Sequence, residues 1–158
     1  MTLQILLNLL IGTVWMLLHD QWNFSTFVIG YFIGFLIVFG LRRFFPVPFY
    51  GKKSWAILKL IFLFIKELFF STIVVMRQVL RPKLNIQPGI FRVETKLTSD
   101  WEITLLSSLI TLTPGSVVME VAPEKGIFYI HAMDVTEFQN SIIRSKEMFE
   151  DAILEVTK

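Results

Sequence analysis

The chain has 158 residues, of which 54% are hydrophobic and only 18% are charged, below the roughly 25% charged share of a typical globular protein. This length leaves room for a few membrane spans and one small domain. Cysteine is absent, which excludes disulfides, thiolate metal sites and cysteine nucleophiles.

The charges are divided unevenly along the chain. Residues 1–81 hold eight Lys and Arg against two acids, a balance of +6, whereas residues 82–158 hold seven against eleven, a balance of −4. Basic residues beside apolar segments are typical of the cytoplasmic face of a membrane. The acidic remainder would repel phosphate groups, so we expect no nucleic acid partner.

Residues 1–41 are predicted to form a transmembrane helical hairpin. Two apolar runs, 2–18 and 22–41, are each close to the roughly 17–25 residues that a spanning helix needs. No positive charge precedes the first run and no small-residue cleavage pattern follows it, so we interpret it as a retained helix rather than a signal peptide. The only fully charged residue in this region is Asp20, in the polar link between the two runs.

Residues 42–53 are predicted to form a basic, extended connector, because Pro46 and Pro48 prevent helix continuation. Helical periodicity resumes over 54–81. On a helical projection its basic residues fall within roughly 40° of one direction, and apolar side chains fill the remainder. Such a stripe is typical of a helix that lies in the lipid headgroup layer. The candidate membrane-surface contacts are Lys52, Lys59, Lys66, Arg77 and Arg81.

The third segment can be interpreted as an interfacial helix or as a third span. Basic clusters flank both of its ends, so a spanning helix would put one cluster on the wrong side of the membrane. A third span would also need Lys59, Lys66 and Glu67 to be buried against another protein. We therefore favour two spans and an interfacial helix, with both termini in the cytoplasm. Lys66 and Glu67 could form an ion-relay pair, but adjacent helical residues diverge, which favours two solvated side chains.

The acidic region 82–158 is predicted to be a small cytoplasmic α+β domain of order β-α-β-β-α. Apolar residues alternate with charged ones from Phe91 to Leu97, as in a half-buried strand. Strands at 116–122 and 127–133 flank a tight-turn sequence of Pro, Glu, Lys and Gly. The first crossover should make strands one and two parallel, and strands two and three should form a hairpin. This arrangement resembles a ferredoxin-like split β-α-β unit that lacks one strand.

Both helices of this domain carry start signals. Ser99 and Asp134 each precede a glutamate three residues later, which makes a capping box. Three strands and two helices make a thin core, so we expect lipid, the basic helix or another subunit to cover it. The charge of −4 suits the basic stripe. The expected buried residues are Trp101, Leu105, Leu109 and Leu112 in the first helix, and Phe138, Ile142, Phe149 and Ile153 in the last.

The sequence contains no glycine-rich phosphate loop, no Gly-x-Ser-x-Gly motif and no carboxylate or histidine cluster with metal spacing. We therefore predict no enzymatic activity and no cofactor or metal. His131 is interpreted as a packed or partner-facing residue rather than a catalytic one. The string Thr113, Pro114, Gly115 and Ser116 could present backbone N–H groups to an anion or a partner loop. A helix stop followed by a strand start also explains it, and we favour that interpretation.

Several motifs together carry a family resemblance. They are the turn 112–116 after an amphipathic helix, the strand 117–121, the return strand that ends at His131, Asp134 before the last helix, and Asn8, Trp15 and 32–34 in the first two apolar runs. In this order and spacing, the chain resembles the E subunits of the Mrp-type (Mnh-type) multisubunit sodium/proton antiporters of bacteria along nearly its whole length. Ser116 stands where that family usually has threonine.

The resemblance implies a plasma-membrane complex that exchanges cytoplasmic sodium for external protons, with other integral membrane subunits and the lipid bilayer as partners. It implies an assembly or stabilising role, with the ion paths in the large complex-I-like subunits. The residues agree, because the two apolar runs lack a charged relay group and cannot move ions alone. The alternative is a free-standing, membrane-tethered module that binds a small ligand or anion at 114–116.

Overall fold

The structure, a computed structural model, describes residues 2–46, 49–83, 86–122 and 126–157. The chain divides into two compact units, Met1–Trp55 and Ala56–Lys158, which we call the N-terminal and C-terminal units. The boundary lies within the long helix α3, Tyr50–Val79, so most of this helix belongs to the C-terminal unit.

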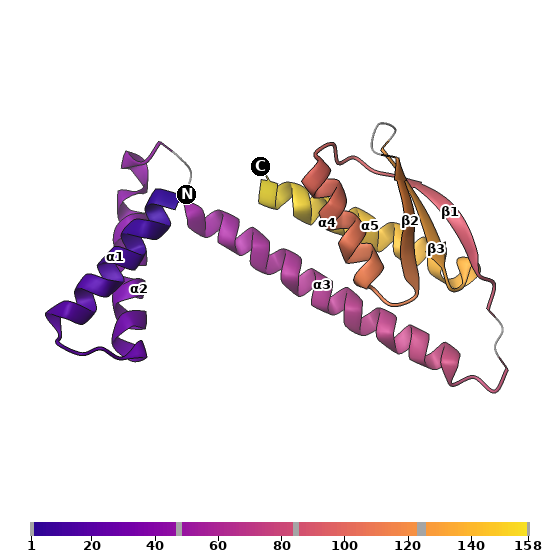
Figure 1. Cartoon of the computed structure of the whole chain (residues 1–158), viewed down its shortest axis with the longest axis horizontal. Coiled ribbons are helices and arrows are strands. Elements are labelled where there is room, and N and C mark those ends of the chain that lie inside the picture. Colours follow the sequence, from indigo (N-terminus) through magenta and orange to yellow (C-terminus); the bar gives the residue numbers. More distant parts are fainter. Residues whose placement is uncertain (1, 47–48, 84–85, 123–125, 158) are drawn as a thin grey trace. The chain divides into compact units, whose positions relative to one another are not determined.

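The N-terminal unit consists mainly of two helices, α1 (Thr2–Leu18) and α2 (Phe24–Gly40), followed by the short 3₁₀ helix η1 (Leu41–Phe44) (Figure 1). Both predicted apolar runs are therefore helical. Asn23 caps α2, since its side-chain oxygen accepts a hydrogen bond from the backbone N–H of Thr26 at 2.7 Å. In the part of the chain that the structure describes, Phe24–Phe44 is the one segment long and apolar enough to cross a bilayer, and α1 is a shorter apolar helix.

Small residues allow α1 and α2 to approach closely. A Cβ atom added at Gly30 would lie 2.5 Å from Cβ of Trp15 and 3.0 Å from the carbonyl oxygen of Gly12. One added at Gly34 would meet the side chain of Asn8. Gly30 thus lies against Trp15, whereas Gly34, further along α2, lies against Asn8, which comes earlier in α1. The two helices are therefore antiparallel.

The C-terminal unit has a three-stranded sheet in the order β1-β3-β2 (Figure 1). β3 is antiparallel to both neighbours, so β1 and β2 run in the same direction but are separated by β3. The predicted antiparallel pairing of the second and third strands is confirmed, as is the order β-α-β-β-α. The strands are β1 (Gly89–Glu94), β2 (Ser116–Ala122) and β3 (Ile127–Ala132).

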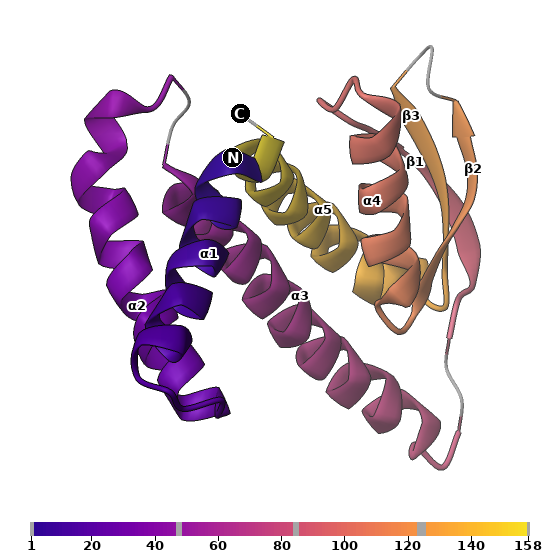
Figure 2. The same ribbon diagram turned by 60° about the vertical axis from the view of Figure 1, so that its left-hand side comes forward.

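The helices α4 (Asp100–Leu112) and α5 (Val135–Thr157) lie on one side of this sheet (Figure 2). The sheet side chains that face them are buried, among them Phe128 and Ile130 of β3. α3 adds Ala56 and Leu60 to the same core. Of the three covers expected for the thin core, lipid, the basic helix or another subunit, the structure shows the basic helix on the side of α4 and α5. The opposite face of the sheet carries exposed apolar side chains, namely Ile90, Val117, Met119 and Tyr129.

The predicted stripe of the last helix is confirmed, but that of α4 is wrong in part. Trp101 is 49% exposed and Leu112 is 61% exposed. α4 is apolar on more than one face, and the face turned towards the core is the one that carries Ile103, Leu106 and Ile110. Spacing alone did not decide between these two stripes.

The two predicted capping residues, Ser99 and Asp134, both precede helices, but only Asp134 makes capping hydrogen bonds. α4 begins after Ser99 as predicted, but the Ser99 side chain makes no capping hydrogen bond. Asp134 does cap α5, since its carboxylate accepts hydrogen bonds from the backbone N–H of Thr136 at 3.0 Å and from its hydroxyl at 2.6 Å. The side chain of Glu137, Pro48 and most of the predicted turn at 123–126 lie outside the described residues.

Candidate functional site

The corner between α4 and β2 is built from the string that the sequence singled out. The hydroxyl of Thr113 donates to the carbonyl oxygen of Leu109 at 2.8 Å, and that of Ser116 donates to Ile110 at 3.1 Å. The Thr113 hydroxyl thus satisfies a carbonyl group at the end of α4, and the Ser116 hydroxyl shares the Ile110 carbonyl with the backbone N–H of Thr113. They close the helix, which is the structural role that we favoured for this string.

The backbone conformation and the close packing of this corner both require glycine at position 115. Its φ of +96° is unfavourable for residues with a side chain. A Cβ atom there would also lie 2.9 Å from the ring of Phe138 and 3.3 Å from a methyl group of Val75. The carbonyl oxygen of Gly115 accepts a hydrogen bond from the backbone N–H of Met133 at 2.9 Å. The corner thus contacts α3, α5 and the end of β3.

An open surface groove of about 420 Å³ brings all five candidate motif residues together. His131 lies opposite both Ile90 and Val117 in the sheet register and is half-buried. The groove has apolar walls and one histidine, but no lysine or arginine among the described residues lines it that could pair with an anion. This composition suits a partner chain better than a small anion. The lining residues are Ile86, Pro88, Thr111, Thr113, Pro114, Gly115, Ser116, Val117, His131 and Met133.

The residues of the basic stripe are exposed along most of α3. The ammonium group of Lys59 pairs with the carboxylate of Glu155 in α5 at 2.9 Å, which fits the expected attraction between the stripe and the acidic domain. Lys66 is exposed, but Glu67 is half-buried and accepts a hydrogen bond from the hydroxyl of Ser145 at 2.6 Å. Glu67 is therefore neither the relay partner of Lys66 nor a fully solvated side chain, the two interpretations considered from the sequence. The other stripe residues, Lys52, Arg77 and Arg81, are exposed.

Sequence reasoning missed a buried polar cluster in the N-terminal unit. Gln4 and Asn8 are fully buried although they lie in an apolar helix. The amide nitrogen of Asn8 donates to the hydroxyl of Tyr50 at 2.7 Å, and the side-chain oxygen of Gln4 accepts from the backbone N–H of Tyr50 at 3.0 Å. Their spacing of four places both amides on one face of α1. This four-residue spacing of two amides in an apolar helix is the sequence signal that indicates the cluster.

A buried ion pair in α5 was also missed. The ammonium group of Lys146 lies 3.0 Å from the carboxylate of Glu150, with the two side chains 6% and 0% exposed. The other carboxylate oxygen accepts hydrogen bonds from the hydroxyl of Thr95 at 2.5 Å and the backbone N–H of Lys96 at 3.2 Å. This cluster ties α5 to the segment after β1. In the residues that the structure describes, no group of three His, Asp or Glu side chains could hold a metal ion.

One solved membrane complex contains a chain of related fold. A chain of the membrane-bound sulfane sulfur reductase, an archaeal respiratory membrane complex, matches with a TM-score of 0.57 and 21% identity over 95% of this chain and 96% of that chain. A chain of the Mrp complex from Dietzia sp. DQ12-45-1b is 28% identical, with a TM-score of 0.46 over 65% of this chain and 96% of that chain.

Curated relatives match the entire chain. The E subunits of the Na+/H+ antiporters of Bacillus subtilis (strain 168) and of Alkalihalophilus pseudofirmus are each 49% identical over 158 residues, which is 100% of both chains in each comparison. The family model described as MNHE, Na+/H+ ion antiporter subunit, matches residues 8–156. The chain therefore belongs to the MNHE family of Na+/H+ ion antiporter subunits.

Proposed function

We propose that this chain is an accessory subunit of a multisubunit Na+/H+ antiporter in the bacterial plasma membrane, where it stabilises the assembly. Its family membership and its identity of 49% with curated antiporter subunits over the whole chain support a place among other integral membrane subunits. The chain is a component of a transporter rather than an enzyme.

The observation that carries the stabilising role is the absence of charge inside the α1–α2 pair. Asp20 is the one charged side chain from Thr2 to Leu41, and it is exposed in the link between the helices. The buried polar groups of this pair are amides and a threonine, which donate and accept hydrogen bonds but do not change charge. A proton or sodium path across the membrane needs ionisable or charged groups. The helix pair therefore supports its neighbours and does not conduct.

The same proposal includes the topology. α1 and α2 cross the membrane as a hairpin, α3 lies in the interface, and both termini are cytoplasmic. The sheet order, with β3 between two strands of like direction, supports the relation to a ferredoxin-like unit that lacks one strand. The alternative of an anion-binding module would use backbone N–H groups of the α4–β2 corner, but the N–H of Thr113 donates to the carbonyl oxygen of Ile110 and Pro114 has none.

Native purification tests the assembly role. A tagged chain should copurify with other integral membrane subunits, and membranes without the chain should contain less of the intact complex. The lone chain, reconstituted in liposomes, should produce no cation-coupled pH change. Transport by the lone chain, or normal complex levels without it, would contradict the proposal.

Labelling of single cysteines tests the topology. A cysteine at Gly51, in the first turn of α3, and another at Lys83, after its end, should both react with an impermeant thiol reagent from the cytoplasmic side. Reaction from opposite sides would replace the interfacial helix with a third span. The absence of natural cysteine makes the background low.

A further inference from the structure

A cavity of about 240 Å³ lies between α3, α5 and the end of α4. Apolar side chains form most of its wall: Phe70, Val74, Phe138, Ile142 and Phe149. An engineered apolar cavity of about 150 Å³ accommodates benzene. This cavity therefore has room for several methylene groups of a hydrocarbon chain.

A second pocket of about 250 Å³ adjoins this cavity at the surface between α3 and α5. The two share four lining residues, Glu67, Phe70, Ser141 and Ser145. The second pocket adds Lys66, Arg144 and Met148, and both basic side chains are exposed. Neither basic group forms an ion pair within the described part of the chain. The pocket thus presents two positive charges beside the Glu67 carboxylate.

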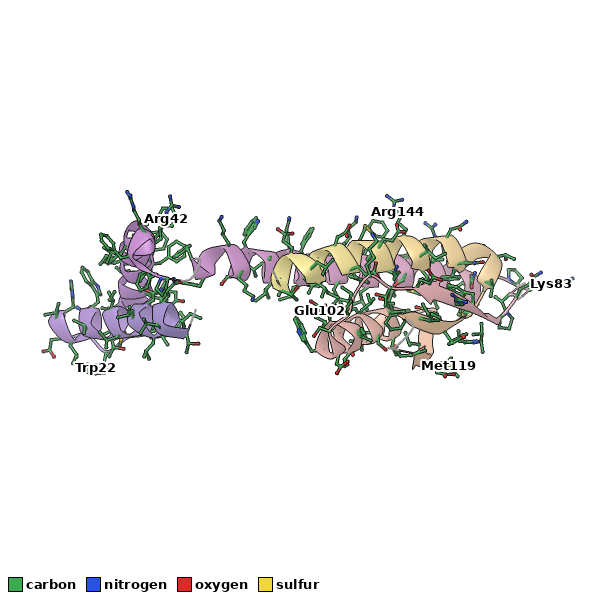
Figure 3. The ribbon with its side chains drawn as sticks, turned by 90° about the horizontal axis from the view of Figure 1, so that it is seen from above. Trp22, Arg42, Lys83, Glu102, Met119 and Arg144 are labelled. Carbon is green, nitrogen blue, oxygen red and sulfur yellow. The ribbon has the colours of Figure 1, made fainter. Side chains whose placement is uncertain are left out.

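The surroundings of this pocket suit a lipid. α3 carries a row of large apolar side chains that the C-terminal unit leaves exposed, and on a helical projection this row adjoins the basic stripe. An apolar face flanked by lysine and arginine is what a helix at a membrane surface presents. Figure 3 shows Arg144 on the side of the C-terminal unit opposite Met119. The exposed row consists of Ile57, Leu58, Ile61, Phe62, Ile65 and Phe69.

We propose that the joined pockets bind one aminophospholipid molecule. Its phosphate lies at Lys66 and Arg144, its primary ammonium lies at the Glu67 carboxylate, and one acyl chain enters the apolar cavity. A purely anionic headgroup would leave Glu67 facing negative charge. A quaternary ammonium headgroup has no N–H to donate to the carboxylate. The chemistry of the pocket therefore favours a primary amine, and the inference depends only on contact with the membrane.

Photolabelling of the intact antiporter complex in lipid nanodiscs tests this inference. The probe is phosphatidylethanolamine with a photoreactive group in its acyl chain, and mass spectrometry locates the labelled peptides. Labelling should concentrate on the segments of α3 and α5 that line the cavity. Phosphatidylglycerol and phosphatidylcholine probes with the same acyl chain should label these segments less. Equal labelling by all three probes would overturn the inference.

Single substitutions test the contributions of Lys66, Arg144 and Glu67 to lipid binding separately. Lys66→Gln and Arg144→Gln each remove one charge-assisted hydrogen bond to the phosphate, so each should reduce labelling by about ten-fold. Glu67→Gln should remove the preference for phosphatidylethanolamine over phosphatidylcholine. Arg77→Gln is the matched control, because Arg77 belongs to the same stripe but lines neither pocket. Equal losses in the control would indicate a general charge effect and contradict a defined site.

A blocking substitution provides a test without loss of charge. Ser141 is exposed and lines both pockets, so Ser141→Trp should fill the space at the surface with little strain on the core. Labelling of the cavity segments should fall to background. The amount of assembled complex is measured in the same membranes, so loss of the lipid site is distinguished from loss of assembly. Undiminished labelling in an assembled Ser141→Trp complex would refute the site.

Discussion

The two units of this chain differ in what becomes of their large apolar side chains. In the N-terminal unit the fully buried positions include Gln4 and Asn8, whereas leucine, isoleucine and phenylalanine side chains point outwards. In the C-terminal unit Phe128, Phe149 and Ile153 are buried. Helices in lipid gain nothing by hiding apolar side chains, so small residues and hydrogen bonds join them. In water the large apolar residues form the core. The burial of large apolar side chains in one unit and their exposure in the other therefore indicate water as the surroundings of the C-terminal unit and lipid as those of the N-terminal unit.

α3 combines the two patterns, with apolar side chains buried on one face and exposed on another. Ala56 and Leu60 on one of its faces enter the core of the C-terminal unit, while Phe62 and Phe69 on another are exposed. A helix with one face in a protein core and another apolar face exposed suits a domain that rests on a membrane surface. Substitutions that affect one unit and spare the other should test this contrast.

The largest effect is expected from Phe149→Ala. Phe149 is 1% exposed in the C-terminal core, and loss of such an aromatic side chain costs about 3–5 kcal/mol of stability. Thermal unfolding of the purified complex, with the amount of chain in membranes, measures this loss. Trp101→Ala is the control, because half of that side chain is exposed and its replacement should cost much less. Equal losses would show that Trp101 is buried against a partner.

Glu150→Gln should cost about 3 kcal/mol, since it leaves the Lys146 ammonium buried without its counter-charge. The amide can still accept the hydrogen bonds from Thr95 and Lys96, which isolates the effect of charge. The double variant Lys146→Met with Glu150→Gln should recover part of the stability, because no buried charge then remains. A double variant less stable than Glu150→Gln, in thermal unfolding of the full chain, would show that the ammonium group has another role.

Gly30→Ala tests the packing rule of the N-terminal unit. The new methyl group would lie 2.5 Å from Cβ of Trp15, so the two helices must separate. Overpacking of this kind costs typically about 1–3 kcal/mol. The amount of intact complex after detergent extraction should fall. Gly40→Ala is the matched control in the same helix, because nothing lies within 4 Å of its added Cβ atom. Equal extraction of both variants would contradict close packing at Gly30.

The order of elements could be predicted from the sequence, because apolar periodicity and turn residues act locally. The helix starts after Ser99 and Asp134, and the helix end before Pro114, depend on neighbours within a few positions. Burial in α4 could not be predicted in the same way. Both of its apolar stripes have helical spacing. Only the packing against the sheet decides that Leu106 is buried and that Trp101 is half exposed.

The site residues were predicted less completely than the fold. The string from Thr113 to Ser116 stood out because Pro and Gly mark a turn. Glu150 did not stand out, because a Lys and a Glu four residues apart usually lie on an exposed helix face. Its burial depends on Thr95, which is 55 residues away in sequence. Long-range partners of this kind leave no local pattern.

The smallest effect is expected from Lys59→Gln, which removes the ion pair between α3 and Glu155. The two side chains are 57% and 49% exposed, so water screens their attraction and the pair contributes at most about 1 kcal/mol. The loss should shrink further at high salt, which thermal unfolding of the full chain at two salt concentrations measures. The apolar contacts of Ala56 and Leu60 should hold α3 on the core without the pair. A large loss that salt does not change would mean that Lys59 is buried in the assembled complex, as a third span requires.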